Sequence, residues 1–246
     1  NEPANWCPTD KTVLANEDVE SDGTCERCGT KVEKRPMRQW VLKITDYADR
    51  LLSDLDKLPK WPQGVKEAQR NWIGRKEGVL VSHKVENSDI VLDAFSAYPA
   101  WLFADTFLVI APEHPLVLEL IKGTSREKEA LNFIQEVKDT PEIERGAANK
   151  EKKGIFTGSY VADPINKGSN MPIWIANFAM MGFGTGIIRC SAHDVRDYAF
   201  AQKYQIPLKE VVERTGEEPV DAHLNQGVLK DSGPFSGKQI NSELID

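Results

Sequence analysis

The sequence predicts an α/β protein: a mixed, β-barrel-like domain with surrounding helices, preceded by a small zinc-ribbon-like module. Three observations support this prediction. Short apolar runs of strand type alternate with helical patterns from about residue 78 onward. Three of the four cysteines lie within the first 28 residues, at a spacing typical of zinc knuckles. The composition, 40% hydrophobic and 28% charged, is that of a globular chain and not of a disordered one.

The overall charge and the apolar pattern exclude several classes of protein. A net charge of −7 argues against a protein that coats nucleic acid, although it leaves room for a local contact with RNA. No run of apolar residues is long enough to predict a membrane span, and the start of the chain does not resemble a signal peptide. The few cysteines favour a reducing compartment, and metal binding over disulfides.

The first 35 residues contain the candidate metal site. Cys7 is followed by Asp10, where a second cysteine would usually complete a knuckle, and Cys25 and Cys28 form a C-x-x-C pair. Zinc prefers four sulfur, nitrogen or oxygen ligands in a tetrahedron, so these four side chains are the predicted ligands of a structural zinc ion. A segment this short and polar buries too little apolar surface to fold by itself. The alternative interpretation is three reduced cysteines beneath a loop.

Two helices are predicted next. Met37–Leu58 has an amphipathic pattern that predicts a helix packed on a core through one face. That face contains Trp40, Ile44, Tyr47, Leu51, Leu55 and Leu58. A second helix is expected over Val65–Ile73, ended by Gly74.

The larger domain is predicted to begin at Gly78. A hairpin is expected from residues 79–85 and 90–95, with His83 on its exposed face. The further expected strands are Phe107–Ala111, Ile155–Phe156, Ile173–Ile175, Ile187–Ile188 and Leu208–Val212, and the expected helices are Pro115–Ile121, Ser125–Val137 and Asp194–Tyr204.

The stretch from Gly182 to Phe200 combines two kinds of signal. Gly184 and Gly186 flank Thr185, so the backbone there can turn tightly or approach a ligand closely. A short strand then leads to a group of polar residues at a helix start, where small anionic or polar ligands tend to bind. These polar residues are His193, Asp194, Arg196 and Asp197. The alternative is a helix N-cap with surface salt bridges.

Five motifs in order resemble the leucyl-tRNA synthetase family. They are NWCPTDKTVLANEDV (Asn5–Val19), MRQWVLKITDYADRLLSDLDKL (Met37–Leu58), QRNWIGRKEG (Gln69–Gly78), APEHPL (Ala111–Leu116) and GTG followed by AHDxRDxxFA. The resemblance covers nearly the whole chain and implies the editing domain. It divides the chain into a zinc-ribbon-like module and helical connector (1–77), the editing domain (78–227) and a return linker (228–246). The family's HIGH-type and KMSKS-type sequences are absent, so we expect a fragment that does not aminoacylate tRNA.

The resemblance also implies roles for the polar residues. The last Asp of the family's HDxRD motif holds the α-ammonium of the misattached amino acid, and here this position is Asp197. Asp194 and His193 are then expected to support the pocket. Met181, Gly184 and Thr185 are expected to line the adenosine end. A salt bridge from Asp197 to Arg196 is the alternative role for that carboxylate.

The second half of the family's pocket is altered in this sequence. The positions of the typical TTRPDT motif, counted back from Pro112, fall on Ser96, Ala97, Tyr98, Pro99, Ala100 and Trp101. Among these we predict Ser96, Ala97, Tyr98 and Trp101 to be substrate-binding positions, although only the proline is kept. The pocket is therefore inactive, retuned or engineered, or the register is shifted.

The predicted function is hydrolysis of the ester that joins a non-cognate amino acid to tRNA(Leu). Isoleucine, valine or a methionine-like side chain is the expected substrate, because one methylene changes binding by only ~1–3 kcal/mol in an apolar pocket. The alternative is a variant that binds the tRNA 3′ end without efficient hydrolysis. The editing domain of an isoleucine or valine enzyme and a purely structural scaffold are further alternatives. Hydrolysis needs no cofactor, and the expected setting is the cytoplasm, as a monomeric fragment beside the rest of the synthetase.

Overall fold

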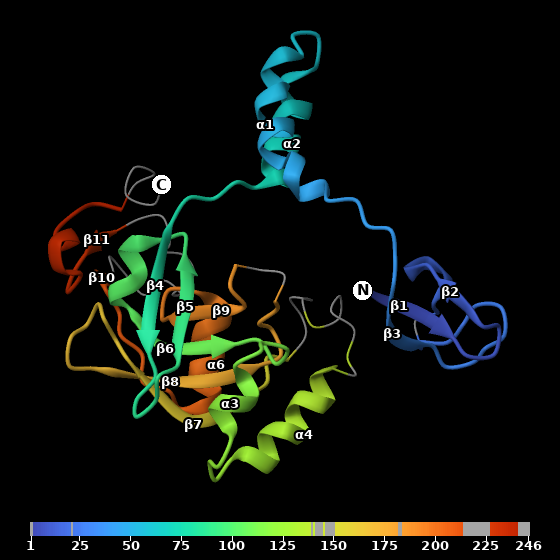
Figure 1. The fold of residues 1–246 in the computed structure, drawn as a ribbon. Coiled ribbons are helices and arrows are strands. Elements are labelled where there is room, and N and C mark those ends of the chain that lie inside the picture. Colours follow the sequence, from blue (N-terminus) through green and yellow to red (C-terminus); the bar gives the residue numbers. More distant parts are fainter. Residues whose placement is uncertain are drawn as a thin grey trace. The chain divides into compact units, whose positions relative to one another are not determined.

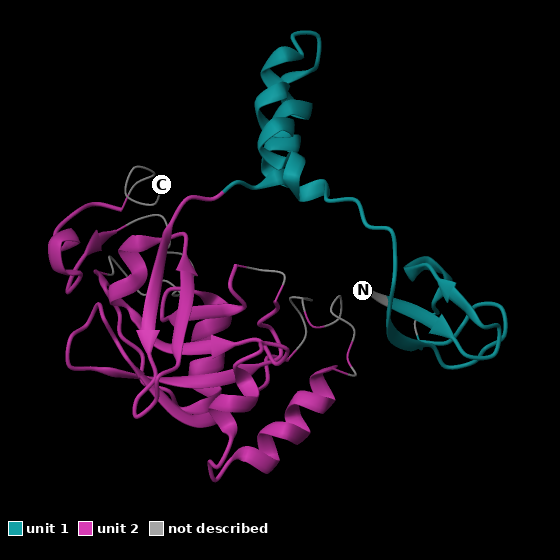
Figure 2. Cartoon of the chain, viewed as in Figure 1, with its two compact units in different colours: residues 1–75 teal, residues 76–246 magenta. Residues whose placement is uncertain are grey.

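The chain folds into two compact units, Asn1–Arg75 and Lys76–Asp246 (Figure 2). The computed structural model describes residues 2–20, 22–138, 140, 145, 151–181, 184–213 and 227–240. The division between the units lies close to the boundary predicted at Gly78. Among the described residues, no helix is long and apolar enough to cross a membrane.

Unit 1 begins with a small antiparallel sheet in the order β2-β1-β3 (Figure 1). Its strands are β1 (Glu2–Cys7), β2 (Thr12–Leu14) and β3 (Glu33–Met37). The apolar core beneath it is small: Cys7, Leu14 and Cys25 are buried, with Val19 and Val32 packed against them. Two of these three buried side chains are thiols, so little aliphatic surface holds this module together.

The helical part of unit 1 is shorter than predicted. Residues up to Met37 pair in β3, where Met37 lies opposite Glu2, so they cannot start a helix. Helical structure begins only at η2 (Ile44–Tyr47) and continues through α1 (Ala48–Asp54) and η3 (Leu55–Lys57). The predicted apolar face is largely exposed, since only Leu55 is buried. The second helix, α2 (Gln63–Ile73), is confirmed, and Gly74 ends it in the left-handed conformation.

Unit 2 is built on a mixed four-stranded sheet in the order β7-β8-β6-β9. Its strands are β6 (Asp105–Ile110), β7 (Gly154–Ala162), β8 (Asn170–Ala176) and β9 (Ile187–Ser191). Strand β6 pairs parallel with β8 and antiparallel with β9, so the predicted mixed α/β class is confirmed. Its last four side chains, Phe107 to Ile110, have no exposed surface, as expected of a strand covered on both faces.

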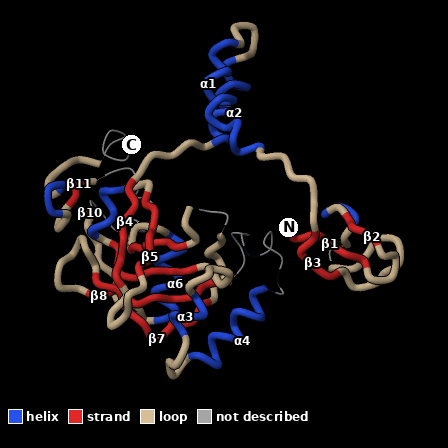
Figure 3. Tube along the Cα trace, viewed as in Figure 1, coloured by secondary structure: helices blue, strands red, loops and turns tan. Residues whose placement is uncertain are grey.

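The predicted hairpin is confirmed, but the sheets do not close into a barrel within the described residues. Strands β4 (Val79–Lys84) and β5 (Val91–Ser96) pair in register around a turn (Figure 3). Strand β5 packs against β9 without a ladder of hydrogen bonds. At the other edge, a single bridge between Val85 and Val161 connects the hairpin to β7. The mixed α/β part of the prediction is therefore confirmed, and the barrel-like part is wrong, because the described strands form separate sheets.

Helices cover the two faces of the sheet. On one face, α3 (Val117–Ile121) and α4 (Glu127–Lys138) pack on an aliphatic cluster that includes Leu108, Ile173 and Ile175. On the other face, α6 (Val195–Tyr204) packs its Phe200 ring against Phe107, at a centroid distance of 5.8 Å.

A third cluster joins segments that are far apart in the sequence. The short turn η4 (Pro99–Phe103) packs on β10 (Val212–Glu213), β11 (Val228–Leu229) and η6 (Gly233–Phe235). Of the strand predicted over Leu208–Val212, only Val212 lies in a strand, as the first residue of β10. The predicted return linker begins with β11, which pairs with β10 inside unit 2.

Gly154 provides a test of how tightly α6 packs on the sheet. A Cβ atom there would lie 2.6 Å from the Phe200 ring and 2.7 Å from the carbonyl oxygen of Ile175. We expect Gly154→Ala to lower the free energy of unfolding of unit 2 by about 1–3 kcal/mol, because overpacking displaces ring or backbone. Denaturant unfolding measures this loss. Gly64→Ala is the control, since its Cβ would meet nothing within 4 Å, and it should not destabilise the chain.

Candidate functional site

The polar residues of the GTG stretch lie at the start of α6, as predicted. Asp194 is the N-cap of α6, and its Oδ1 accepts a hydrogen bond from the backbone N–H of Asp197 at 3.0 Å. The capping interpretation of Asp194 is therefore confirmed. This bond satisfies one of the free donors of the first helical turn and orients the helix start toward the end of β9.

Asp197 is enclosed by the protein. Its exposed fraction is only 3%, although the resemblance assigns it to a substrate's ammonium group. Its Oδ1 accepts a hydrogen bond of 2.9 Å from Nε of Arg196. Burial raises the pKa of the carboxyl to about 7, although the charge of Arg196 opposes that rise. Burial also raises the pKa of the Cys190 thiol, and the nearby Asp197 charge adds to that effect.

Arg196 is itself held in place on three sides. It pairs with Asp197, its Nε lies 3.8 Å from Asp194, and its guanidinium lies over the Phe178 ring at 4.6 Å from the centroid. The ion pair that we weighed as the alternative role of Asp197 is thus present. In this conformation Arg196 occupies one oxygen of the carboxylate that the resemblance assigns to an ammonium group.

His193 lies against Trp101, which brings the two predicted halves of the site together. Their ring centroids are 4.9 Å apart, and the two side chains are 5% and 8% exposed, respectively. Nε2 of His193 accepts a hydrogen bond from the backbone N–H of Val211 at 3.0 Å. The indole therefore packs between the His193 ring at the helix start and the apolar cluster that includes Val211 and Val212.

The glycine loop contacts the other predicted segments. Gly184 and Gly186 both have positive φ, 56° and 76°, which explains the glycines. The carbonyl of Gly186 accepts a hydrogen bond of 2.8 Å from the N–H of Ala111, at the end of β6. A Cβ on Gly186 would lie 2.6 Å from Sδ of Met181. Thr185 Oγ1 is buried with no hydrogen-bond partner among the described residues.

The altered strand-loop lies beside this glycine loop. A Cβ on Gly184 would lie 3.7 Å from Cβ of Phe95, next to Ser96. Ser96 Oγ accepts a hydrogen bond from the N–H of Tyr98 at 3.3 Å. Ala97 is half-buried, and Tyr98 is 44% exposed. The structure thus places the altered strand-loop beside the glycine loop, with the Tyr98 side chain partly exposed.

The sequence analysis missed a buried charged cluster next to this site, which we call the Arg189 network. Nε of Arg189 donates to Asp105 at 2.6 Å, and Nη2 lies 3.4 Å from an oxygen of Asp163. Nη1 contacts Nε2 of His83. The one sequence signal for this cluster was Arg189 itself, a charged residue that follows the apolar pair Ile187 and Ile188 in a predicted strand.

The prediction that His83 is exposed was wrong. Its side chain has no exposed surface, and Nδ1 lies 3.2 Å from the carbonyl oxygen of Leu92. Burial and the charge of Arg189 lower its pKa, so the ring is neutral and accepts from the guanidinium. Burial raises the pKa of Asp105 to about 6, and Arg189 opposes that rise.

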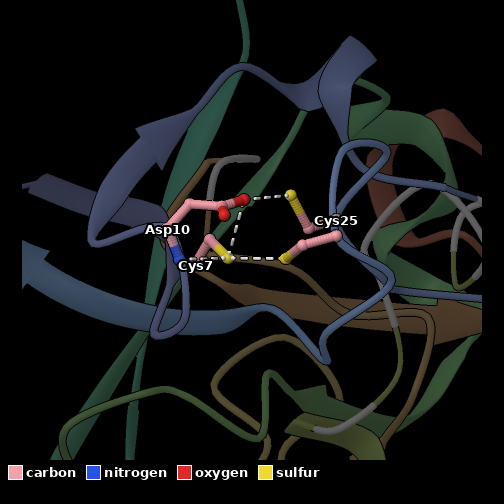
Figure 4. Close-up of side chains that lie close together, drawn as sticks. Cys7, Asp10 and Cys25 are labelled. Carbon is pink, nitrogen blue, oxygen red and sulfur yellow. Dashed lines mark hydrogen bonds between the residues drawn. The ribbon is translucent and has the colours of Figure 1, made fainter.

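The predicted metal ligands lie together in unit 1 (Figure 4). One ligand atom from each of Cys7, Asp10, Cys25 and Cys28 falls within 4.8 Å of the others, so the group could hold a metal ion. Asp10 Oδ2 lies 3.4 Å from Sγ of Cys7 and 3.3 Å from Sγ of Cys25. Hydrogen bonds from the thiols of Cys28 and Cys25 lower the pKa of Asp10, which favours the ionised carboxylate.

Comparison with known proteins decides the family. The family described as "Leucyl-tRNA synthetase, editing domain" matches residues 70–245. The chain belongs to this family. Leucine–tRNA ligases of Thermotoga maritima and Petrotoga mobilis are 46% and 45% identical to it, over 95% and 96% of this chain. The chain spans 29% of the length of each of these relatives.

A solved leucyl-tRNA synthetase has the same fold over most of the chain. It is the ternary complex of agnB2 LeuRS from Agrobacterium radiobacter K84 with tRNA and LeuAMS, with a TM-score of 0.65 and 37% identity. The match covers 88% of this chain and 26% of that one. This structural match agrees with a mixed α/β editing domain. The family description names the leucyl enzyme and not the isoleucyl or valyl enzymes.

The raised pKa of Asp197 predicts a dependence of stability on pH. A carboxyl whose folded pKa exceeds its unfolded value stabilises the fold below about pH 4, and this stability is lost as the pH rises through about 7. We therefore expect Asp197→Asn to reduce the fall in unfolding free energy between pH 5 and pH 8 by on the order of 1–3 kcal/mol.

Thermal melts of parent and variant at the two pH values measure this difference. Glu119→Gln, at an exposed position of α3, is the control and should keep the parent's dependence. An equal fall in the parent and in Asp197→Asn would show that Asp197 is already ionised at pH 5.

Proposed function

We propose that this chain is the editing segment of a leucyl-tRNA synthetase, and that in this chain hydrolysis of the mischarged ester is slow. The substrate class is tRNA(Leu) whose 3′ end carries a non-cognate amino acid such as isoleucine, valine or a methionine-like residue. The family match supports the substrate class, and the related ligases and the tRNA-bound synthetase support tRNA and the rest of the enzyme as partners.

The burial of Trp101 is the observation that carries the proposed slow hydrolysis. In the family, a threonine at this position faces the amino-acid pocket. Here an indole, 8% exposed and in contact with His193, occupies that place in the sequence and packs on Ala100, Val211 and Val212. Close-packed side chains move little, so the branched side chain of a bound isoleucine or valine would have to displace the indole.

Asp197 supports the same conclusion by a separate argument. Its proposed role is to hold the α-ammonium, so that water attacks the ester carbonyl in a fixed geometry. In this conformation the carboxylate is buried and bonded to Arg196. Substrate binding would have to exchange that ion pair for the ammonium, and the exchange lowers the net gain in free energy.

We further propose that the unit 1 cluster binds one structural zinc ion. Three thiols and one carboxylate are a suitable donor set, and the cluster's ligand atoms already lie close together. The ion would link the turn after β1 to the turn that holds Cys25 and Cys28, which the small apolar core holds only weakly.

We expect the parent to hydrolyse Ile-tRNA(Leu) at least ~10²-fold more slowly than a related editing domain with the usual threonine-rich motif, equal to about 2.7 kcal/mol of lost transition-state stabilisation. The double variant Trp101→Thr/Tyr98→Arg should recover more activity than either single variant, because both side chains serve one bound substrate. Single-turnover deacylation of labelled Ile-tRNA(Leu) is the measurement.

Two controls make this test specific. Adding Asp197→Ala to the double variant should abolish the recovered activity, while binding of uncharged tRNA(Leu) is measured in parallel. Full activity in the parent would show that Trp101 does not obstruct the substrate. A parent that binds tRNA without turnover supports the alternative of a binding domain.

The zinc proposal predicts about one equivalent of zinc in protein purified without added metal. Cys28→Ser should lower the zinc content and the melting temperature of unit 1, since a ligand is lost. Cys190→Ser is the matched control, because this buried cysteine lies in unit 2 outside the cluster. Negligible zinc in the parent, together with a melting curve that chelation does not change, would contradict the proposal.

A further inference from the structure

Two side chains from other elements donate hydrogen bonds to the end of the η4 turn, which contains Trp101. Nη2 of Arg189 donates to the carbonyl of Leu102 at 3.1 Å, and Nδ2 of Asn166 lies 3.4 Å from the carbonyl of Phe103. These carbonyls end the short helix, where backbone acceptors lack helical partners. The last residues of the turn are thus fixed by side chains from other parts of the chain.

Arg189 is held in a fixed position when it donates to the carbonyl of Leu102. Its side chain is 1% exposed, and its other donors contact Asp105, Asp163 and His83. A guanidinium has five N–H donors on three nitrogens in a rigid fork, whereas a lysine has three donors on a single nitrogen, so an arginine can hold more elements in a fixed geometry. Here it joins β4, β6, β9 and the turn after β7 to the end of η4.

Asn166 extends the same connections. Its Nδ2 donates to Asp163 at 2.8 Å, and its Oδ1 accepts from Lys209 at 3.1 Å. Asp163 is therefore bonded to both side chains that hold η4. On the opposite side of the turn, Trp101 contacts His193.

We propose that Arg189 is a positioning residue that holds η4 so that Trp101 remains packed against His193 and keeps the candidate editing site closed. That this closes an editing site rests on the proposed function, whereas the restraint on Trp101 does not. Loss of the fork should free the end of η4 and expose the indole, while the sheet keeps its packing.

Fluorine NMR of the 5-fluorotryptophan-labelled chain tests this restraint. The chain has six tryptophans, and Trp101→Phe and Trp174→Phe assign the two signals needed. Arg189→Lys keeps the buried positive charge but removes the fork. We expect the Trp101 signal to shift and to gain a solvent isotope effect, while the signal of Trp174, which packs on Phe200, keeps its position.

Two further variants separate the restraint from a general loss of packing. Arg145→Lys is the matched control: Arg145 is also buried, pairs with Glu113 and donates to the carbonyls of Asn177 and Ala179, but it does not contact η4. It should leave the Trp101 signal unchanged. Asn166→Ala removes the weaker contact and should shift the Trp101 signal in the same direction, and it decides the matter if Arg189→Lys does not fold.

The outcomes are distinct. An unchanged Trp101 signal in folded Arg189→Lys, or an equal change in Arg145→Lys, overturns the proposal. A released Trp101 with unchanged, slow deacylation of Ile-tRNA(Leu) supports the restraint and rejects closure as the reason for slow hydrolysis. Fast deacylation by the parent, with Trp101 still shielded, rejects the proposed slow function and leaves the restraint intact.

Discussion

A buried guanidinium must have its donors satisfied, and in unit 2 this requirement organises the region around the candidate site. Arg189 lies in β9 and is fully enclosed, so its charge and its N–H groups need partners within the protein. Asp105 and Asp163 supply the charge, and His83 and a backbone carbonyl of η4 supply further acceptors. Elements that are distant in sequence are thereby held in one arrangement.

This arrangement changes how the family's motif is interpreted. The altered strand-loop lies beside the GTG loop at Phe95 and beside the start of α6 at Trp101, which contacts His193. The indole of Trp101 packs against His193, and Arg196 pairs with Asp197; the proposal of slow hydrolysis rests on these two contacts. The fold of the domain is thus kept, while the side chains that line its centre pair with one another.

Unit 1 depends on a different kind of interaction. Its sheet has a core of a few side chains, two of them thiols, and the four candidate ligands lie at the ends of its turns. The helices that follow expose most of their apolar side chains, so they gain little from burial within unit 1. The hydrophobic core in this part of the chain is therefore small, and the proposed zinc ion would add to its stability.

The sequence by itself determined the family, the mixed α/β class, the hairpin, α2 and the helix start at Asp194. These features depend on local signals: alternation, caps, and glycines at positive φ. It also identified the four side chains that meet in unit 1, because knuckle spacing brings ligands together over short distances.

Only the tertiary structure decided the burial of His83, the enclosure of Asp197, the late helix start at Ile44 and the lack of barrel closure. Each of these depends on contacts between distant segments. His83 is buried because Arg189, 106 residues away, needs an acceptor, and residues up to Met37 are extended because β1 pairs with them. Periodicity describes one segment at a time, whereas the burial of a polar side chain depends on which partner the fold brings to it.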